Sequence, residues 1–274
     1  MLLKKNAAII ILIDFSSKSI STIEQTYSLA KSLNAKLILM FAGLQSENQH
    51  KNELTEITDK TKKESGLEVE SFYISGTIFK SITQKATEVD CGLIVVGLNT
   101  DDKLKPIINE TELNKFLKIA PCPVFTIHDI DNRSNCKNIL IHIDLSAESR
   151  EKVGVVIQLA KIFNADVSII NVFPPNDEQY ENEILPYINQ VKKYIKSQGV
   201  NCSNKSICSK KIAESIIDYS INNSCDIIVQ MNKQNLSLKE MLFGTMANEI
   251  IQKSTIPVLS INPMVRESIS SGIH

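Results

Sequence analysis

At two matching places in the chain, an apolar run is followed by an aspartate and, two residues later, by a serine. Such a pair of polar side chains could bind a polar ligand. Asp14 and Ser16 follow the apolar run 7–13, and Asp144 and Ser146 follow the run 138–143. A carboxylate at the end of a buried strand can accept hydrogen bonds from a ribose or a base. Asp and Ser are also favoured where a helix begins, so the residues alone leave both interpretations open.

The main chain at Thr111 and Thr245 is a candidate for phosphate binding. Both threonines stand where a helix is expected to begin, and the free amides of a helix N-terminus attract anions. Gly244 precedes Thr245. Since ligands of an open parallel sheet lie beyond the carboxyl ends of its strands, we expect Asp14 near the loop before Thr111, and Asp144 near Gly244 and Thr245.

The chain is an internal duplication. Residues 92–127 align without a gap with residues 226–261, which lie 134 positions later. Near the start of each half the shift is 130, so that Asp144 corresponds to Asp14. Two copies of one unit therefore make up the chain, with a few residues inserted in the middle of the second.

His142 is the histidine with the most distinctive position. It interrupts the apolar strand 138–143 two residues before Asp144, so both side chains are expected on one face of the sheet. A general acid–base pair is conceivable, but the first copy has Leu12 here and no nucleophile motif accompanies the pair. The pattern favours a buried or edge histidine with a hydrogen-bond partner. We expect no catalytic residue and no metal site.

Strands and helices are predicted to alternate along both copies. The expected strands are 7–13, 36–41, 67–74, 92–96 and 124–127, then 138–143, 166–171, 201–207, 226–230 and 258–261. The expected helices are 16–33, 50–65, 78–89 and 111–119, then 147–163, 177–198, 212–224 and 246–253. Such alternation implies right-handed crossovers and a sheet covered on both faces. We predict an α/β fold of two tandem five-stranded parallel-sheet sandwiches.

The two halves are expected to pack against each other. The polar segment 130–135 between them is short, which predicts a first domain over 1–130, a second over 136–263 and a tail over 264–274. The last strands, 124–127 and 258–261, are short and apolar and would leave an unpaired edge in an isolated half. Pairing them would cover both edges and form an intramolecular pseudo-dimer.

Composition narrows the classes of function. The net charge is -1 and no basic tract occurs, which argues against a nucleic-acid partner. The longest apolar run, 7–13, is too short to cross a bilayer and makes a poor signal peptide, so we predict a cytoplasmic protein with no membrane partner. The six cysteines include no Cys-x-x-Cys and are interpreted mainly as reduced packing residues.

Several short motifs recur in the same order in both copies. They are strand-Asp-x-Ser (ILIDFS and IHIDLS), the Leu-Ala-Lys…Asn-Ala helix exits at 29–35 and 159–165, and a proline before each last strand; the first copy adds the strand IVVG. Together they resemble the universal stress proteins over about residues 7–261. The resemblance implies a Rossmann-like sheet of the adenine nucleotide alpha hydrolase-like type, domains paired through their last strands, and a role in stress adaptation. It also leaves room for a homodimer and for a protein partner that the sequence does not identify.

Some members of that family bind ATP or AMP and others do not. The binding members resemble Gly-x-x-Gly, nine residues, then Gly-Ser or Gly-Thr. In this chain the corresponding positions are Gly97, Thr100, Glu110 and Thr111, then Met231, Gln234, Gly244 and Thr245. Neither copy is intact. A carboxylate at Glu110 would cost about 4 kcal/mol at about 4 Å from a phosphate, for an effective dielectric constant near 20.

The resemblance and these departures together predict a non-catalytic stress-response or regulatory module with degenerate nucleotide-binding loops. No cofactor is expected, although the second half retains room for ATP or AMP. The alternative is a nucleotide-binding sensor, or slow ATP hydrolase, working through the second half. A third hypothesis is another small ligand held by Met231, Gln234 or Asn232. The candidate ligand-binding residues are Asp14, Gly97, Thr111, Asp144, Gly244 and Thr245.

Overall fold

A computed structural model describes residues 3–41, 47–74, 77–98, 110–127, 136–175, 177–232 and 246–263. The first half contains β1 (Ala8–Ile13), α1 (Ser17–Leu33), β2 (Lys36–Phe41), α2 (Glu47–Ser65), β3 (Val69–Tyr73), α3 (Ile78–Glu88), β4 (Leu93–Gly97), α4 (Glu110–Ile119) and β5 (Val124–Ile127). The second half contains β6 (Asn138–His142), the 3-10 helix η1 (Glu148–Arg150), α5 (Val153–Phe163), β7 (Asp166–Phe173), α6 (Glu178–Ser197), β8 (Cys202–Cys208), α7 (Ile212–Asn222), β9 (Ile227–Met231), α9 (Met246–Lys253) and β10 (Val258–Ile261).

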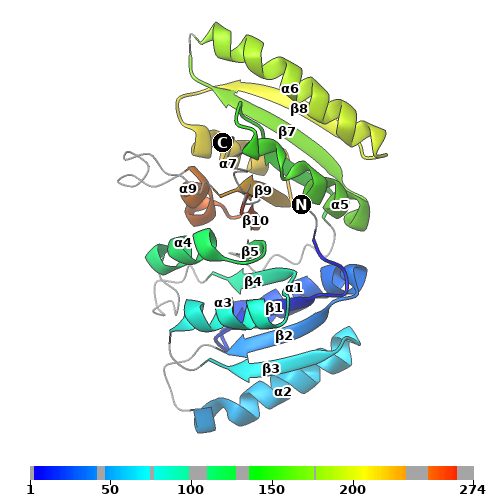
Figure 1. Cartoon of the computed structure of the whole chain (residues 1–274), viewed down its shortest axis with the longest axis vertical. Helices are drawn as coiled ribbons and strands as arrows, with labels where there is room; N and C mark the ends of the chain where they lie inside the picture. Colours follow the sequence, from blue (N-terminus) through cyan, green and yellow to red (C-terminus); the bar gives the residue numbers. More distant parts are fainter. Residues whose placement is uncertain are drawn as a thin grey trace, which may run out of the picture.

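All ten strands belong to one sheet, in the order β3-β2-β1-β4-β5-β10-β9-β6-β7-β8. Every pairing inside a half is parallel, as the alternation of strands and helices predicted. The halves meet through β5 and β10, which pair antiparallel with Leu259 opposite Phe125. The predicted pairing of the two last strands is therefore confirmed, and it turns two five-stranded sheets into one (Figure 1).

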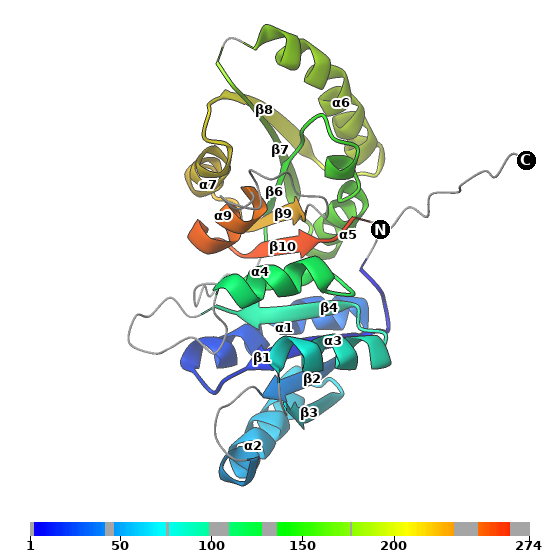
Figure 2. The same cartoon turned by 60° about the vertical axis from the view of Figure 1, so that its left-hand side comes forward.

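Helices cover both faces of the sheet in both halves. One face packs against α1 and α2 in the first half and α5 and α6 in the second; the other packs against α3 and α4, then α7 and α9. Figure 2 shows the two sets of helices on either side of the sheet, with β3 and β8 toward opposite ends of the molecule. The central strands are apolar on both faces because both faces are buried, whereas the edge strand β8 is largely polar and exposed.

Side chains of the second half satisfy carbonyl groups at the end of α4 in the first. Asn232 Nδ2 donates to Leu117 O at 3.2 Å, and Asn262 Nδ2 donates to Ala120 O at 2.9 Å. The last carbonyls of a helix have no partner within it, so these bonds fix α4 against β10 and its neighbours. Asn232, proposed above as a ligand residue, therefore has a structural role at the seam between the halves.

The helix predicted over 147–163 is wrong at its start. Residues 148–150 form the 3-10 helix η1, and α5 begins only at Val153. In the first half the equivalent helix is continuous from Ser17, and it lies close to Gly97 at the end of β4. The second half has the larger Met231 at that position, on the strand β9 that lies against η1.

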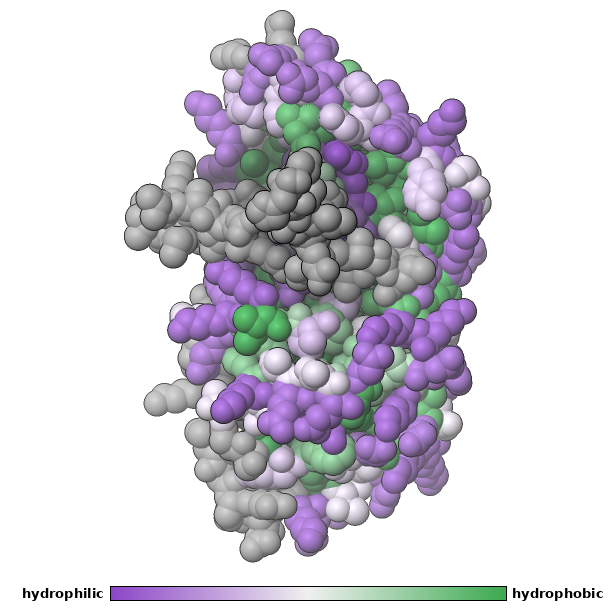
Figure 3. All heavy atoms as spheres, in the orientation of Figure 1, coloured by the Kyte–Doolittle hydropathy of each residue, from purple (hydrophilic) through white to green (hydrophobic). Residues whose placement is uncertain are grey.

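The surface and the cysteines agree with the predicted class of protein. Figure 3 shows polar side chains spread over both halves of the face in view, with apolar ones scattered among them. Within the described ranges, no helix combines the length and the apolar character needed to cross a bilayer. All six cysteines are free thiols, and five of them are buried, whereas Cys208 is exposed.

Candidate functional site

The carboxyl ends of the central strands place the predicted acidic residues beside the predicted loops. Leu12 of β1 pairs with Val96 of β4, so Asp14 and Gly97 lie at neighbouring strand ends. In the second half Ile141 of β6 pairs with Val229 of β9, which brings Asp144 near Met231. These are the two places where an open parallel sheet holds ligands.

Asp14 and Asp144 both build the turn that starts the following helix. The Ser16 amide and hydroxyl donate to Asp14 Oδ1 at 3.0 and 2.5 Å, and the Ser16 hydroxyl oxygen accepts from the amide of residue 19 at 3.2 Å. The Ser146 amide donates to Asp144 Oδ1 at 2.9 Å, and its hydroxyl donates to the same oxygen. The capping interpretation is thus correct for Ser16, which caps α1, whereas Ser146 accepts from the amide of Ser149 in a turn and caps neither η1 nor α5.

In the first half, aromatic rings occupy the strand ends. Phe15 stacks on Phe41 with ring centroids 4.1 Å apart, and Phe41 meets Tyr73 at 5.3 Å. These three residues, called here the aromatic stack, cover the ends of β1, β2 and β3. Their rings lie on the face of the sheet that α1 and α2 cover.

Gly97 has a packing reason to be glycine. A Cβ built at this position would lie 2.7 Å from Thr22 Oγ1 of α1, which is closer than real Cβ contacts come. The glycine therefore allows α1 to approach β4. Its candidate role in phosphate binding has no support beyond its position at the strand end.

In the second half, the equivalent region is polar and partly unsatisfied. Four buried side-chain atoms of the described residues have no hydrogen-bond partner: His142 Nε2, Arg150 Nη1, Asn171 Nδ2 and Gln230 Oε1. His142, Asn171 and Gln230 lie in the carboxyl-terminal parts of β6, β7 and β9, and Arg150 is the last residue of η1. The first half has only apolar residues at the equivalent positions: Leu12, Ile20, Phe41 and Val96.

Two ionisable residues complete this region. Lys152 directly precedes α5 and is only 3% exposed, and Asp144 follows β6. Together with the four residues that carry the unsatisfied atoms, they are called here the carboxyl-edge cluster. Buried polar groups in native proteins nearly always have partners, so a set of unpartnered ones at the ligand-binding edge of a sheet needs an explanation.

The charges of the carboxyl-edge cluster influence one another. Burial lowers the pKa of His142 to about 4, with a further lowering by Lys152 and an opposing effect of Asp144. Burial also lowers the pKa of Lys152 to about 8, and Asp144 partly offsets this. For Asp144, burial would raise the pKa, but the Ser146 hydrogen bonds, His142 and Lys152 together hold it below its usual value.

Three members of the cluster are held at one end and free at the other. Gln230 Nε2 donates to Ala247 O and to Ser260 Oγ, both at 3.1 Å, which leaves Oε1 free. Asn171 Oδ1 accepts from Ser206 Oγ at 2.9 Å. The Arg150 guanidinium lies 4.4 Å from the ring centroid of Tyr187. Side chains fixed in this way are preorganised for a ligand.

The remaining predicted site residues are not brought into this cluster. Thr111 lies in the first turn of α4, which begins at Glu110, so it does not cap the helix from outside. Gly244 and Thr245 lie outside the described residues. His142 was expected to be a buried or edge residue with a hydrogen-bond partner; it is buried, but its Nε2 has no partner among the described residues.

Sequence reasoning from motifs missed Arg150, Lys152, Asn171 and Gln230. A comparison of equivalent positions in the two copies finds them, because each stands where the first copy has an apolar residue or a threonine. His142 was noticed by this comparison. Extending it along both copies would have collected the others.

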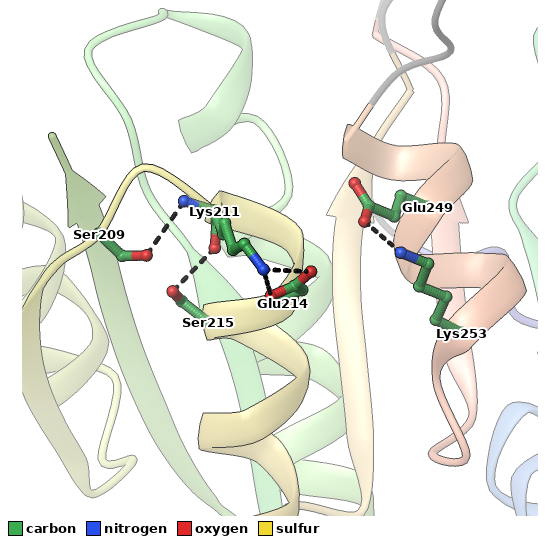
Figure 4. Close-up of polar contacts among 6 residues, drawn as sticks. All are labelled: Ser209, Lys211, Glu214, Ser215, Glu249 and Lys253. Carbon is green, nitrogen blue, oxygen red and sulfur yellow. Dashed lines mark hydrogen bonds and ion pairs between the residues drawn. The ribbon is translucent and has the colours of Figure 1, made fainter.

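Two ion pairs on the neighbouring helices α7 and α9 form a separate charged group. Lys211 Nζ lies 2.8 Å from Glu214, and Lys253 Nζ lies 2.7 Å from Glu249 (Figure 4). Such exposed pairs contribute little to stability and leave no carboxylate free for a metal. Across the described ranges, no three His, Cys, Asp or Glu residues are grouped closely enough to hold a metal ion.

Comparison with known proteins shows what the chain and its fold are similar to. The sequence model of the universal stress protein family matches residues 135–262. A universal stress protein from Archaeoglobus fulgidus has a TM-score of 0.76 at 16% identity, over 96% of this chain and 98% of that one. A putative universal stress protein from Pseudomonas aeruginosa has a TM-score of 0.71 at 18% identity, over 94% and 93%. Curated protein sequences give no significant match.

The second half therefore matches the universal stress protein model, and the whole chain has the fold of these two solved structures. The cytoplasmic domain of a prokaryotic cation chloride cotransporter shares the architecture, with a TM-score of 0.54 at 12% identity over 94% of this chain and 96% of that one. Since the fold occurs in such different proteins, function has to be argued from the site.

The close contact at Gly97 predicts a measurable coupling with Thr22. Gly97→Ala should lower the free energy of unfolding by about 1–3 kcal/mol, because the new Cβ overlaps Thr22 Oγ1. In a Thr22→Ala background the same change should cost about 1 kcal/mol less. Urea unfolding of the four chains gives both values. An equal effect of Gly97→Ala in both backgrounds would contradict the packing role of this glycine.

The lowered pKa of His142 predicts a loss of stability in acid. The folded chain binds its proton only near pH 4, whereas the unfolded chain binds it near pH 6.5, so stability falls as the pH drops between these values. The loss should amount to about 3 kcal/mol. His142→Leu, the first-half residue, should remove that part of the slope in urea unfolding followed from pH 7 to about 4. Identical slopes for the two chains would refute the assignment.

Proposed function

We propose that the chain is a non-catalytic stress-response module in which only the second half binds a small ligand, while the first half is its structural partner. The observation that carries this proposal is the asymmetry between the copies. The same strand ends hold the aromatic stack in one copy and the carboxyl-edge cluster in the other. Leaving one buried polar group unsatisfied costs about 1–3 kcal/mol, so four of them are retained against a considerable penalty.

The ligand is proposed to be other than ATP. In the first half the aromatic stack and the close contact at Gly97 oppose a nucleotide. In the second half Met231 stands where the family's first glycine would bring the main chain against a phosphate, and its side chain packs against the core. The rival function, an ATP or AMP sensor in the second half, would have to hold the phosphates without this glycine.

The absence of catalysis is part of the proposal. His142 is the one cluster member of the type most used as a general base, and its Nε2 contacts no serine, threonine or cysteine hydroxyl or thiol in the described chain. The cluster has the donors and charges of a binding site. It lacks a base positioned against a nucleophile.

Thermal denaturation of the full chain tests the proposal. ATP, ADP and AMP at millimolar concentration are expected to leave the melting temperature unchanged, whereas a protein-free extract of the source cells should raise it. Asn171→Phe, which gives the second half the first-half residue, should abolish the rise, and circular dichroism confirms that this variant is folded. Leu185→Ala, at an exposed site on α6, is the control and should retain the rise.

Two other outcomes would contradict the proposal. A nucleotide-induced rise that Asp144→Asn abolishes would favour the sensor and overturn the choice of a different ligand. If neither the nucleotides nor the extract changes the melting temperature, the second half is not a ligand-binding domain.

A further inference from the structure

We propose that the ligand of the second half is a small oxyanion that also carries a hydroxyl group, of the class of short phosphorylated polyols and hydroxy acids. This inference rests on the proposed function and names the chemistry of its ligand. It follows from three properties of the carboxyl-edge cluster: its net charge, its balance of donors and acceptors, and its distribution over the two faces of the sheet.

The charge of the cluster favours an anion. Arg150 and Lys152 bring two positive charges and Asp144 brings one negative charge. Within the described chain, neither cation forms an ion pair with a carboxylate, and Lys152 is 3% exposed. A buried positive charge that Asp144 offsets only in part is costly, and an anion that reaches it recovers part of that cost. Arginine in particular matches the flat geometry of a phosphate or carboxylate.

The free donors and acceptors of the carboxyl-edge cluster also restrict which groups the ligand carries. Arg150 Nη1 and the ammonium of Lys152 can only donate, so they require acceptor atoms on the ligand. Gln230 Oε1 can only accept, and its orientation is fixed because Nε2 donates to the carbonyl oxygen of Ala247. The ligand must therefore present a donor as well as an oxyanion. A hydroxyl group is the simplest donor, and His142 Nε2 lies on the same face to bind its oxygen or its proton.

The residues of the carboxyl-edge cluster lie on both faces of the sheet. His142 and Gln230 follow Leu140 and Ile228 on the face covered by α7 and α9. They occupy adjacent positions on paired strands, one residue beyond the Ile141–Val229 pair. Asn171, two residues after Ile169, lies on the face covered by α5 and α6. Arg150 of η1 lies against Tyr187 of α6, and Gln230 is bonded to Ala247 of α9, so a ligand that contacts both must lie across the ends of β6 and β9.

Buried water is the simpler explanation for the unsatisfied atoms. A water molecule can bridge two to four polar groups, and the cluster would need at least one on each face of the sheet. Water satisfies hydrogen bonds but does not compensate the charges of Arg150 and Lys152. The first half builds the same strand ends without any such groups, so the fold itself does not require them.

Calorimetric titration of the full chain separates these explanations. The probes are glycerol 3-phosphate, L-lactate, inorganic phosphate and glycerol. We expect glycerol 3-phosphate or lactate to bind more tightly than phosphate, which lacks the carbon-bound hydroxyl, and glycerol not to bind. Binding by one of the two hydroxylated anions and not by the other identifies phosphate or carboxylate as the charged group.

Matched variants assign the effect to the cluster. Lys152→Met should weaken binding of the better probe by about tenfold or more, while Lys253→Met, at an exposed lysine on α9, should leave it unchanged. Gln230→Leu should bring the hydroxylated probe down to the affinity of plain phosphate. Lys152→Met removes a buried charge, so it should be at least as stable as the parent chain in urea.

Three results would overturn the inference: glycerol binding as tightly as the anions, anion binding that survives Lys152→Met, or no binding by any probe. The proposed function is judged separately. If the cell extract still raises the melting temperature and Asn171→Phe abolishes that rise, the second half binds a ligand of another class.

Discussion

The antiparallel pair of β5 and β10 is the contact on which the rest of the structure depends. Each half taken alone would end in a short, apolar and unpaired strand, which is a site for aggregation. Pairing the two strands places ten strands in one sheet and leaves only β3 and β8 as edges. Because the pair is antiparallel, the strands of the two halves run in opposite directions. The carboxyl ends of β1 and β6 therefore open on opposite sides of the molecule.

This arrangement allows the two copies to diverge. The contact between the halves is made by β5, β10, α4 and the two asparagines that bond to the end of α4. The carboxyl ends of β1 and β6 take no part in it. One copy has filled its strand ends with the aromatic stack and a close helix contact, both of which add to packing. The other has kept its strand ends polar. We interpret the first copy as the stabilising partner and the second as the copy that binds.

The carboxyl-edge cluster weakens the fold that carries it. Buried donors, acceptors and a lysine with a pKa lowered to about 8 all oppose folding, and the apolar residues of the first copy would not. The long shared core offsets that penalty. A stability cost concentrated at the ligand-binding edge of one copy is the pattern expected of a functional site and not of a packing device.

Much of the fold could be predicted from the sequence because each strand is an apolar block between clear stop signals. The strands 36–41, 124–127 and 258–261 and the helix 246–253 were predicted with the observed bounds. The break before Val153 could not be, since residues 147–152 contain no Gly or Pro to mark it and the equivalent helix of the first copy is continuous. The candidate site was only partly predictable. Asp144 follows from its motif, whereas Lys152 and Gln230 look like surface residues until the sheet buries them.

A high-resolution crystal structure of the full chain, purified without added ligands, tests the central claim most directly. The account predicts electron density for a small molecule between the ends of β6 and β9, in contact with Lys152 or Arg150, and an intact aromatic stack at the ends of β1 to β3. Density for a ligand beside Asp14, with Phe15 and Phe41 moved apart, would contradict it. So would a second half whose unsatisfied atoms are all bonded to protein.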